Sequence, residues 1–176
     1  MDHLAERDRR KFLLEQYKAA LKNPKRGNAK YVTSFSMFDK NSQPLYWLIF
    51  CTNNLHGLYE MKRAMWAVDK TGQFRFSDED NPNQLSLFSE SYDPKWLAEQ
   101  LAQSLAGKTM RVAKIREYVL TDTPCYLFRD ALKSLEVGKH KRVVVVKQPA
   151  GRKPGTYDKD QLEEIELKFE ASLFSG

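Results

Sequence analysis

Residues 121–147 read TDTPCYLFRDALKSLEVGKHKRVVVVK, and they are the part of the sequence that most clearly indicates a fold. This stretch begins with Thr121-Asp122-Thr123-Pro124, a tight turn that can cap a helix. We predict a helix from Pro124 to about Leu135 or Val137, ended by Gly138. Four consecutive valines within Arg142–Lys147 then predict a strand. The stretch is therefore a turn, a helix and a strand in close succession.

The segments on either side extend this pattern. Upstream, Asp93-Pro94 predicts a helix start with aspartate as N-cap, and Gly107 predicts its end. A short strand at 109–112 and a second helix at 113–120 follow, and residues 165–169 alternate like a strand that pairs back. Three helices and a two-stranded ribbon in this order are typical of a winged helix-turn-helix, whose third helix enters the DNA major groove.

Positive charge is concentrated in this part of the chain. The 176 residues contain 29 Lys+Arg and 23 Asp+Glu, a net charge of +6. Residues 108–157 alone contain twelve basic and four acidic side chains, and no acidic residue occurs at 139–153. Such a segment predicts phosphate binding that weakens with salt, with a solvated face that serves only solubility as the alternative.

The third helix supplies candidate contacts to bases. We expect Leu127, Ala131 and Leu135 to face the core, Arg129 to contact guanine, and Lys133 to contact guanine or a phosphate. A winged helix can also dock a protein or a neighbouring domain, or serve as a structural appendage. The residues predicted to bind nucleic acid are Tyr126, Arg129, Lys133, Lys139, Lys141, Arg142, Lys147, Arg152 and Lys153.

The first part of the chain has a different pattern. Helical periodicity near residues 4–21 is followed by strands at 31–38 and 45–51 and a helix at 57–68. Because residues 45–51 are apolar throughout, we expect that strand to be covered on both faces. In the last helix we expect a core stripe of Leu58, Met61, Met65 and Val68, with Lys62 and Arg63 facing elsewhere.

The predicted fold class is α+β. It comprises a partial α/β unit at 1–70, a linker at 71–92, and a winged helix-turn-helix domain at 93–176. The linker is assigned because residues 69–92 are acidic, polar and rich in turn residues.

Several chemistries are excluded by missing motifs. There is no glycine-rich phosphate loop, HExxH motif or nucleophile elbow, and three histidines and two distant cysteines offer no metal-ligand spacing. We therefore expect no catalytic residue, no metal and no cofactor. Cys51 is predicted to be a buried core thiol, and Cys125 a packed thiol, with a lowered pKa at a helix N-terminus as the alternative. His56 is interpreted as a loop residue, with a ligand crevice as the alternative.

The chain has no apolar run near 18 residues, so no transmembrane helix is expected. Two cysteines without a pairing pattern favour a reducing, cytoplasmic location.

A resemblance is carried by residues 45–69, LYWLIFCTNNLHGLYEMKRAMWAVD. This run resembles the three-Cys-motif partner protein family (TcmP), and the likeness continues through 74–78 into the winged helix. The resemblance implies a Rossmann-like, methyltransferase-type domain followed by a winged helix, with residues 1–70 similar to the end of the first domain. It also implies a three-Cys-motif partner protein, of radical-SAM type.

The family's methyl-donor-binding segment has no counterpart in this sequence. We therefore expect a chain that is not an enzyme by itself. It is either a fragment or a short form that dimerises through residues 1–70, since apolar side chains such as Tyr46, Leu48 and Phe50 would otherwise be exposed. The predicted function is binding of double-stranded nucleic acid, with DNA favoured over RNA. The alternative is docking to the three-Cys-motif partner or to a methyltransferase-like domain.

Overall fold

The computed structural model describes residues 2–39, 44–69, 75–77, 92–139 and 141–171. The fold is α+β, and the chain divides into two compact units. The first unit comprises Met1–Lys70 with Phe74–Asn83, and the second comprises Thr71–Gln73 with Gln84–Gly176. Most of the predicted linker at 71–92 lies outside the described residues. Among the helices described, none is long and apolar enough to cross a membrane.

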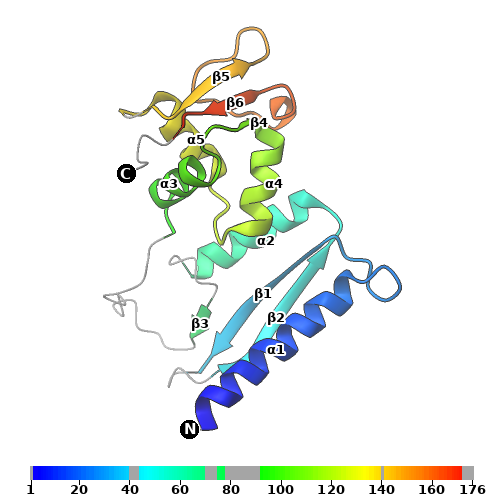
Figure 1. Cartoon of the computed structure of the whole chain (residues 1–176). Helices are drawn as coiled ribbons and strands as arrows, with labels where there is room; N and C mark the ends of the chain where they lie inside the picture. Colours follow the sequence, from blue (N-terminus) through cyan, green and yellow to red (C-terminus); the bar gives the residue numbers. More distant parts are fainter. Residues whose placement is uncertain (1, 40–43, 70–74, 78–91, 140, 172–176) are drawn as a thin grey trace. The chain divides into compact units, whose positions relative to one another are not determined.

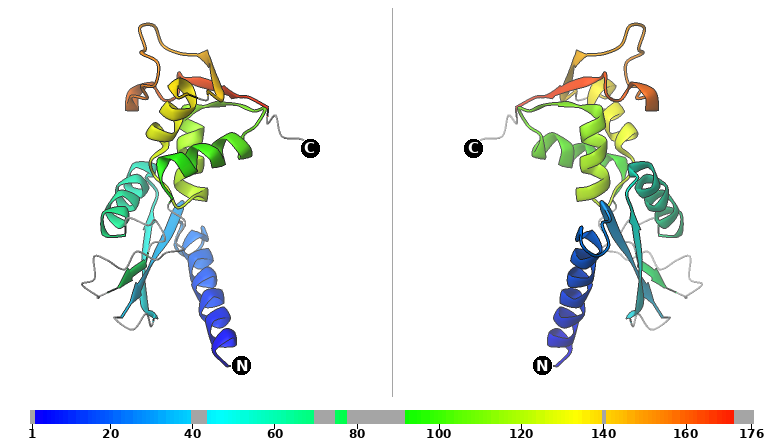
Figure 2. Two further views of the ribbon diagram at one scale, coloured as in Figure 1. Left: turned by 90° about the vertical axis from the view of Figure 1, so that its left-hand side faces the viewer. Right: turned by 90° about the vertical axis from the view of Figure 1, so that its right-hand side faces the viewer.

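The first unit is a three-stranded sheet with one helix on each face (Figures 1 and 2). The strand order is β2-β1-β3, with β1 antiparallel to β2 and parallel to β3. Its elements are α1 (Asp2–Lys22), β1 (Tyr31–Phe38), β2 (Pro44–Thr52), α2 (Leu55–Val68) and β3 (Arg75–Ser77).

Local signals in the sequence account for the ends of these elements. The start of α2 is set by Asn54, whose side chain accepts a 2.8 Å hydrogen bond from the backbone N–H of His56. After α1, the chain turns so closely that a Cβ at Gly27 would lie 2.3 Å from the carbonyl oxygen of Leu21. Only glycine fits this turn, which brings β1 back along the helix.

The prediction that residues 45–51 are covered on both faces is wrong. Within the described part of the chain, β2 pairs only with β1 and is the edge strand of the sheet. Leu45 and Tyr46 are each 58% exposed, and Leu48 is 50% exposed. Cys51 is likewise exposed, which corrects the prediction of a buried thiol. An apolar strand is covered on both faces only when further strands and helices surround it.

The buried stripe of α2 also differs from the prediction. Leu58 and Met65 are buried as expected, whereas Val68 is 57% exposed and Lys62 is only 3% exposed. Lys62 lies four residues after Leu58, so the two side chains project from the same face of the helix. The buried positions of α2 are thus Leu58, Lys62 and Met65, and Asp69, the C-cap just after the helix, is also buried.

The second unit packs three helices against a small antiparallel sheet of order β4-β6-β5 (Figure 1). Its elements are α3 (Pro94–Ser104), β4 (Thr109–Arg111), α4 (Val112–Asp122), α5 (Phe128–Val137), β5 (Val143–Lys147), the 3-10 helix η1 (Lys159–Gln161) and β6 (Glu166–Phe169).

The start and end of α3 follow the sequence signals. Asp93 accepts a 2.7 Å hydrogen bond from the backbone N–H of Trp96, and Pro94 occupies the first turn. Beyond the helix, Gly107 has a φ of +74°, a conformation that favours glycine.

The three helices of the second unit and its strands β5 and β6 contribute to one core. The sheet supplies Leu167 and Phe169, which are fully buried. The helices supply residues at helical spacing, so each presents one apolar face inward. The largest fully buried helical side chains are Leu97, Leu101, Val112, Ile115, Val119, Leu120, Phe128 and Leu132.

The third helix begins later than predicted, at Phe128 instead of Pro124. Residues 123–126 form a turn, in which the backbone N–H of Cys125 donates to the hydroxyl of Thr123 and its thiol donates to the carbonyl of Tyr92. Cys125 is fully buried, in agreement with the prediction of a packed thiol. Leu127 is consequently the N-cap of α5 and only half-buried, which corrects the prediction that Leu127 faces the core. Phe128 is buried in its place.

Candidate functional site

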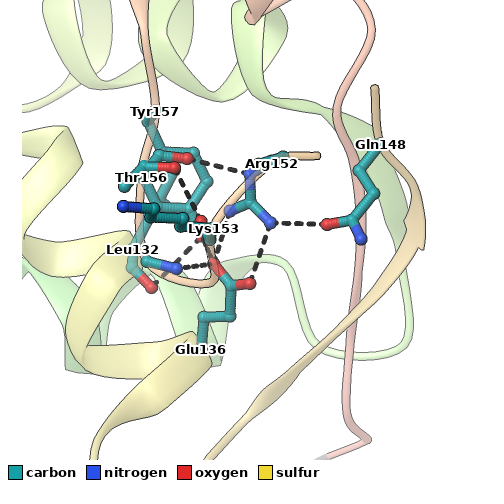
Figure 3. Close-up of polar contacts among 8 residues, drawn as sticks. Leu132, Glu136, Gln148, Arg152, Lys153, Thr156 and Tyr157 are labelled. Atoms are coloured by element: carbon teal, nitrogen blue, oxygen red, sulfur yellow. Dashed lines mark hydrogen bonds and ion pairs between the residues drawn. The ribbon is translucent and has the colours of Figure 1, made fainter. Parts of the chain in front are cut away.

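A buried polar network joins α5 to the long connection between β5 and β6 (Figure 3). The carboxylate of Glu136, on α5, accepts two hydrogen bonds from the guanidinium of Arg152, at 2.9 Å and 2.6 Å. The hydroxyl of Tyr157 and the backbone N–H of Gly155 also donate to Glu136, at 2.6 Å and 2.9 Å. The side chain of Arg152 is 0% exposed, so this is an interior ion pair.

Two further N–H groups of Arg152 donate within the same connection. Its Nε donates to the carbonyl oxygen of Thr156 at 2.8 Å, and one terminal nitrogen donates to the side chain of Gln148 at 2.8 Å. The guanidinium also lies 4.8 Å from the centre of the Tyr157 ring. A buried charge is tolerated only when it is paired and hydrogen-bonded, and Arg152 meets both conditions.

The network displaces the pKa values of its members. Burial by itself would raise the pKa of Glu136, but hydrogen bonds from Arg152, Tyr157 and Gly155 outweigh it, so the pKa lies below 4.5. Burial would lower the pKa of Arg152, and its pairing with Glu136 raises it instead. Burial and the neighbouring Glu136 carboxylate both raise the pKa of Tyr157 above 10.0. Near neutral pH the network is therefore a carboxylate, a guanidinium cation and a neutral phenol.

Arg152 is among the residues predicted from the sequence to bind nucleic acid. Its side chain is 0% exposed and its guanidinium makes four hydrogen bonds inside the unit, so it has no access to a phosphate. Its neighbour Lys153 is exposed and makes no side-chain hydrogen bond or ion pair in the described structure. The two adjacent cations thus have opposite roles: Arg152 holds the loop and Lys153 faces solvent.

The loop 152–157 packs along one side of α5. Gly155 has a φ of +76°, and a Cβ at this position would lie 3.1 Å from Cγ of Lys133 and 3.2 Å from Cγ2 of Val137. At its far end, the carbonyl oxygen of Tyr157 accepts a 2.8 Å hydrogen bond from Nε of Arg129, whose guanidinium lies 5.0 Å from the centre of the Phe128 ring. Arg129 is therefore half-buried and anchored to the loop, although we predicted it to contact guanine.

Six of the predicted residues remain exposed cations. In the described structure none of them forms an ion pair, so their charge faces solvent uncompensated. The six are Lys133, Lys139, Lys141, Arg142, Lys147 and Lys153. The remaining predicted residue, Tyr126, is half-buried in the turn before α5.

The six cations are distributed over two places. Lys139, Lys141 and Arg142 lie in the connection from α5 to β5, where the backbone N–H of Arg142 donates to the carbonyl of Leu135. Lys147 ends β5, and Lys153 lies two residues before Gly155, the loop residue that packs against Lys133.

Sequence reasoning missed Glu136, Gln148 and Tyr157. Glu136 lies four residues after Leu132, on the core side of α5, and an acidic residue at that spacing is the signal that could have predicted a buried pair. No comparable signal identifies Arg152 as its partner, because the two are 16 residues apart. Over the described ranges, no group of three or more His, Cys, Asp or Glu side chains could hold a metal ion.

Comparisons with protein-family models, curated proteins and solved structures find no match to this chain. The class that the fold and the site define is thus a two-unit α+β protein, with a network-anchored loop and a set of exposed cations in its second unit.

Proposed function

We propose that the chain binds double-stranded nucleic acid, in the first place DNA, through its second unit. The observation that carries the proposal is the set of six exposed cations without an ion pair, on α5, on the α5–β5 connection, at the end of β5 and on the loop after it. Lysine and arginine that replace condensed counterions supply most of the affinity of a protein for a duplex.

The order of elements supports the same function. The second unit has the element order of a winged helix-turn-helix domain: α3, β4, α4, α5, β5 and β6. Its sheet has the strand order β4-β6-β5. In that reading α5 is the third helix and the connection from β5 to β6 is the wing. The first unit is read as a Rossmann-like remnant of a TcmP-like protein, not catalytic by itself, and a cytoplasmic location fits the two free cysteines.

A titration of fluorescently labelled duplex DNA tests this function. The full chain should raise the fluorescence anisotropy of the duplex at about 50 mM salt and lose affinity steeply toward 200 mM. A protein that binds no duplex at the lower salt concentration would disprove the proposal, because sequence-independent affinity is strongest there.

A second candidate function, protein docking, is favoured by the exposed apolar residues of β2. Leu45, Tyr46 and Leu48 lie on an edge strand that contains no charged residue, and such an edge can accept a further strand. The occupant would be a second copy of the chain, a three-Cys-motif partner or a methyltransferase-like domain. Light scattering after size exclusion tests the homodimer: a dimer that Tyr46→Lys dissociates supports it, and a monomer at every concentration contradicts it.

A further inference from the structure

The most informative surface is the seam between α5 and the loop 152–157, which we call the helix–loop seam. It carries Arg129 and Lys133 on the helix and Lys153 on the loop. Lys153 belongs to a turn in which its carbonyl oxygen accepts from the hydroxyl of Thr156 at 2.6 Å. Gly155 of the same turn packs against Lys133. The loop backbone that carries Lys153 therefore lies next to the part of α5 that carries Lys133.

This arrangement is held from inside the unit. Arg152, just before the turn, and Gly155, within it, both donate to the carboxylate of Glu136. Figure 3 shows Arg152 beside Glu136, which lies about one helical turn after Lys133 in the sequence. Arg152 and Gly155, which fix the loop, therefore flank Lys153, which carries its exposed charge. The network acts as a positioning device for Lys153.

The open side of α5 is poorly suited to reading bases. Apart from Lys133, its exposed residues are Asp130, Ser134 and Val137. Asp130 would repel phosphates, and Arg129 is anchored to Tyr157 on the flank of the helix that the loop occupies. Arg, Asn and Gln, which make bidentate contacts to guanine and adenine in the major groove, are lacking among the exposed residues of α5, and Lys133 is the only cation among them.

We propose that the helix–loop seam binds the sugar-phosphate backbone of the duplex through Lys133 and Lys153, and that binding is independent of base sequence. The inference rests on the proposed function and adds what is recognised: phosphates held at a fixed spacing, with no contact to base edges. Contacts to phosphates position a protein on a duplex without carrying sequence information.

The first test compares two labelled duplexes of equal length and unrelated sequence, titrated with the full chain between 50 and 200 mM salt. We expect the two dissociation constants to agree within about threefold, because every duplex presents the same phosphates whatever its base sequence. A difference above about tenfold would show that bases are read and would overturn the inference while leaving the proposed function intact.

The second test removes the seam's charge. The double variant Lys133→Ala/Lys153→Ala should lower the slope of log K against log salt by about 2, because each lost phosphate contact removes about 0.9. The control is Lys95→Ala/Lys159→Ala, which removes the same charge from exposed positions on α3 and η1 and should change the slope by less than 1. Equal slopes in the two variants would refute the seam as the binding surface, whereas a wild-type chain that binds neither duplex would refute the proposed function itself.

The third test moves the loop without changing its charge. Gly155→Val places methyl groups against Lys133 and Val137, and Gly151→Val is the matched control because it has the same positive φ and nothing within 4 Å of its Cβ. With folding confirmed by circular dichroism, Gly155→Val should reduce the salt slope by about 1, and Gly151→Val should retain the wild-type slope. If both variants keep that slope, the loop's position does not matter and the positioning role is wrong.

Discussion

The hydroxyl of Tyr157 donates a 2.6 Å hydrogen bond to the carboxylate of Glu136, 21 residues earlier in the chain. The same carboxylate oxygen accepts from the guanidinium of Arg152 at 2.6 Å and from the backbone N–H of Gly155 at 2.9 Å. One oxygen atom on α5 thus collects three donors from the loop before β6. The stability of this loop should depend on Glu136 more than on any exposed residue of the loop.

Removal of Arg152 should strongly destabilise the second unit. Arg152→Ala leaves the buried Glu136 without its cation, and the loss of one partner of a buried pair costs about 3–5 kcal/mol. Urea unfolding followed by circular dichroism measures the change in the free energy of unfolding. The matched control is Lys153→Ala, an exposed neighbour whose substitution should stay within about 0.5 kcal/mol. Equal effects of the two substitutions would contradict the buried role of Arg152.

Stability should fall in acid because of Glu136. The pKa of this residue is lower in the folded chain than its ordinary value of 4.5, so its contribution is present above pH 4.5 and is lost as pH falls through the folded pKa. Thermal melting between pH 3 and 7 measures the effect. Glu136→Gln should melt at a lower temperature at pH 7 and lose less on acidification than the wild type. A variant with the same acid slope as the wild type would show that other carboxylates cause the loss.

Stability should also fall in alkali, for the opposite reason. The pKa of Tyr157 is raised in the folded chain, so the stabilisation of the neutral phenol is complete below pH 10.0 and is lost as pH rises above that value. Tyr157→Phe keeps the ring but has no proton to lose, and its melting temperature should depend less on pH above 10. A spectrophotometric titration of the tyrosines checks this directly. In the wild type Tyr157 should ionise only when the chain unfolds, and Tyr157→Phe should have one fewer tyrosine of this kind.

The start of α5 can be tested by truncating two adjacent residues. Phe128 is 1% exposed and belongs to the core, so Phe128→Ala should cost about 3–5 kcal/mol in the free energy of unfolding. Leu127 is half-buried at the N-cap, and Leu127→Ala should cost less than half of that. A helix that began at Pro124 with Leu127 in the core would reverse the order of the two values.

The elements that sequence reasoning predicted well are those set by local chemistry. The strand at Tyr31–Phe38 is recognised from its residue types and the turn residues after it. The start of α3 at Asp93 and Pro94 is recognised because an aspartate N-cap acts on an N–H only three residues away. The predicted start of α5 is wrong because Thr123 and Pro124 are typical of both a helix cap and a turn. In the structure they form a turn, and the thiol of Cys125 in this turn contacts the carbonyl of Tyr92, 33 residues earlier.

For the predicted site residues, too, local sequence identifies some properties and distant contacts decide others. Local sequence identifies residues 139–153 as basic, and six of the nine predicted residues are exposed cations. It does not distinguish Arg152 from Lys153, which are adjacent in the same loop. Their difference depends on whether a carboxylate on α5 lies within hydrogen-bonding distance of the guanidinium.

The order of the helices and strands in the second unit, and the concentration of positive charge there, follow from the amino-acid sequence, because helix caps, apolar periodicity and charge are properties of neighbouring residues. Three features depend on the folded structure: Arg152 is buried, Arg129 is anchored to the carbonyl of Tyr157, and β2 leaves the apolar side chains of Leu45, Tyr46 and Leu48 exposed. Burial depends on which distant segments cover a residue, and the partners of Arg129 and Arg152 lie 28 and 16 residues away.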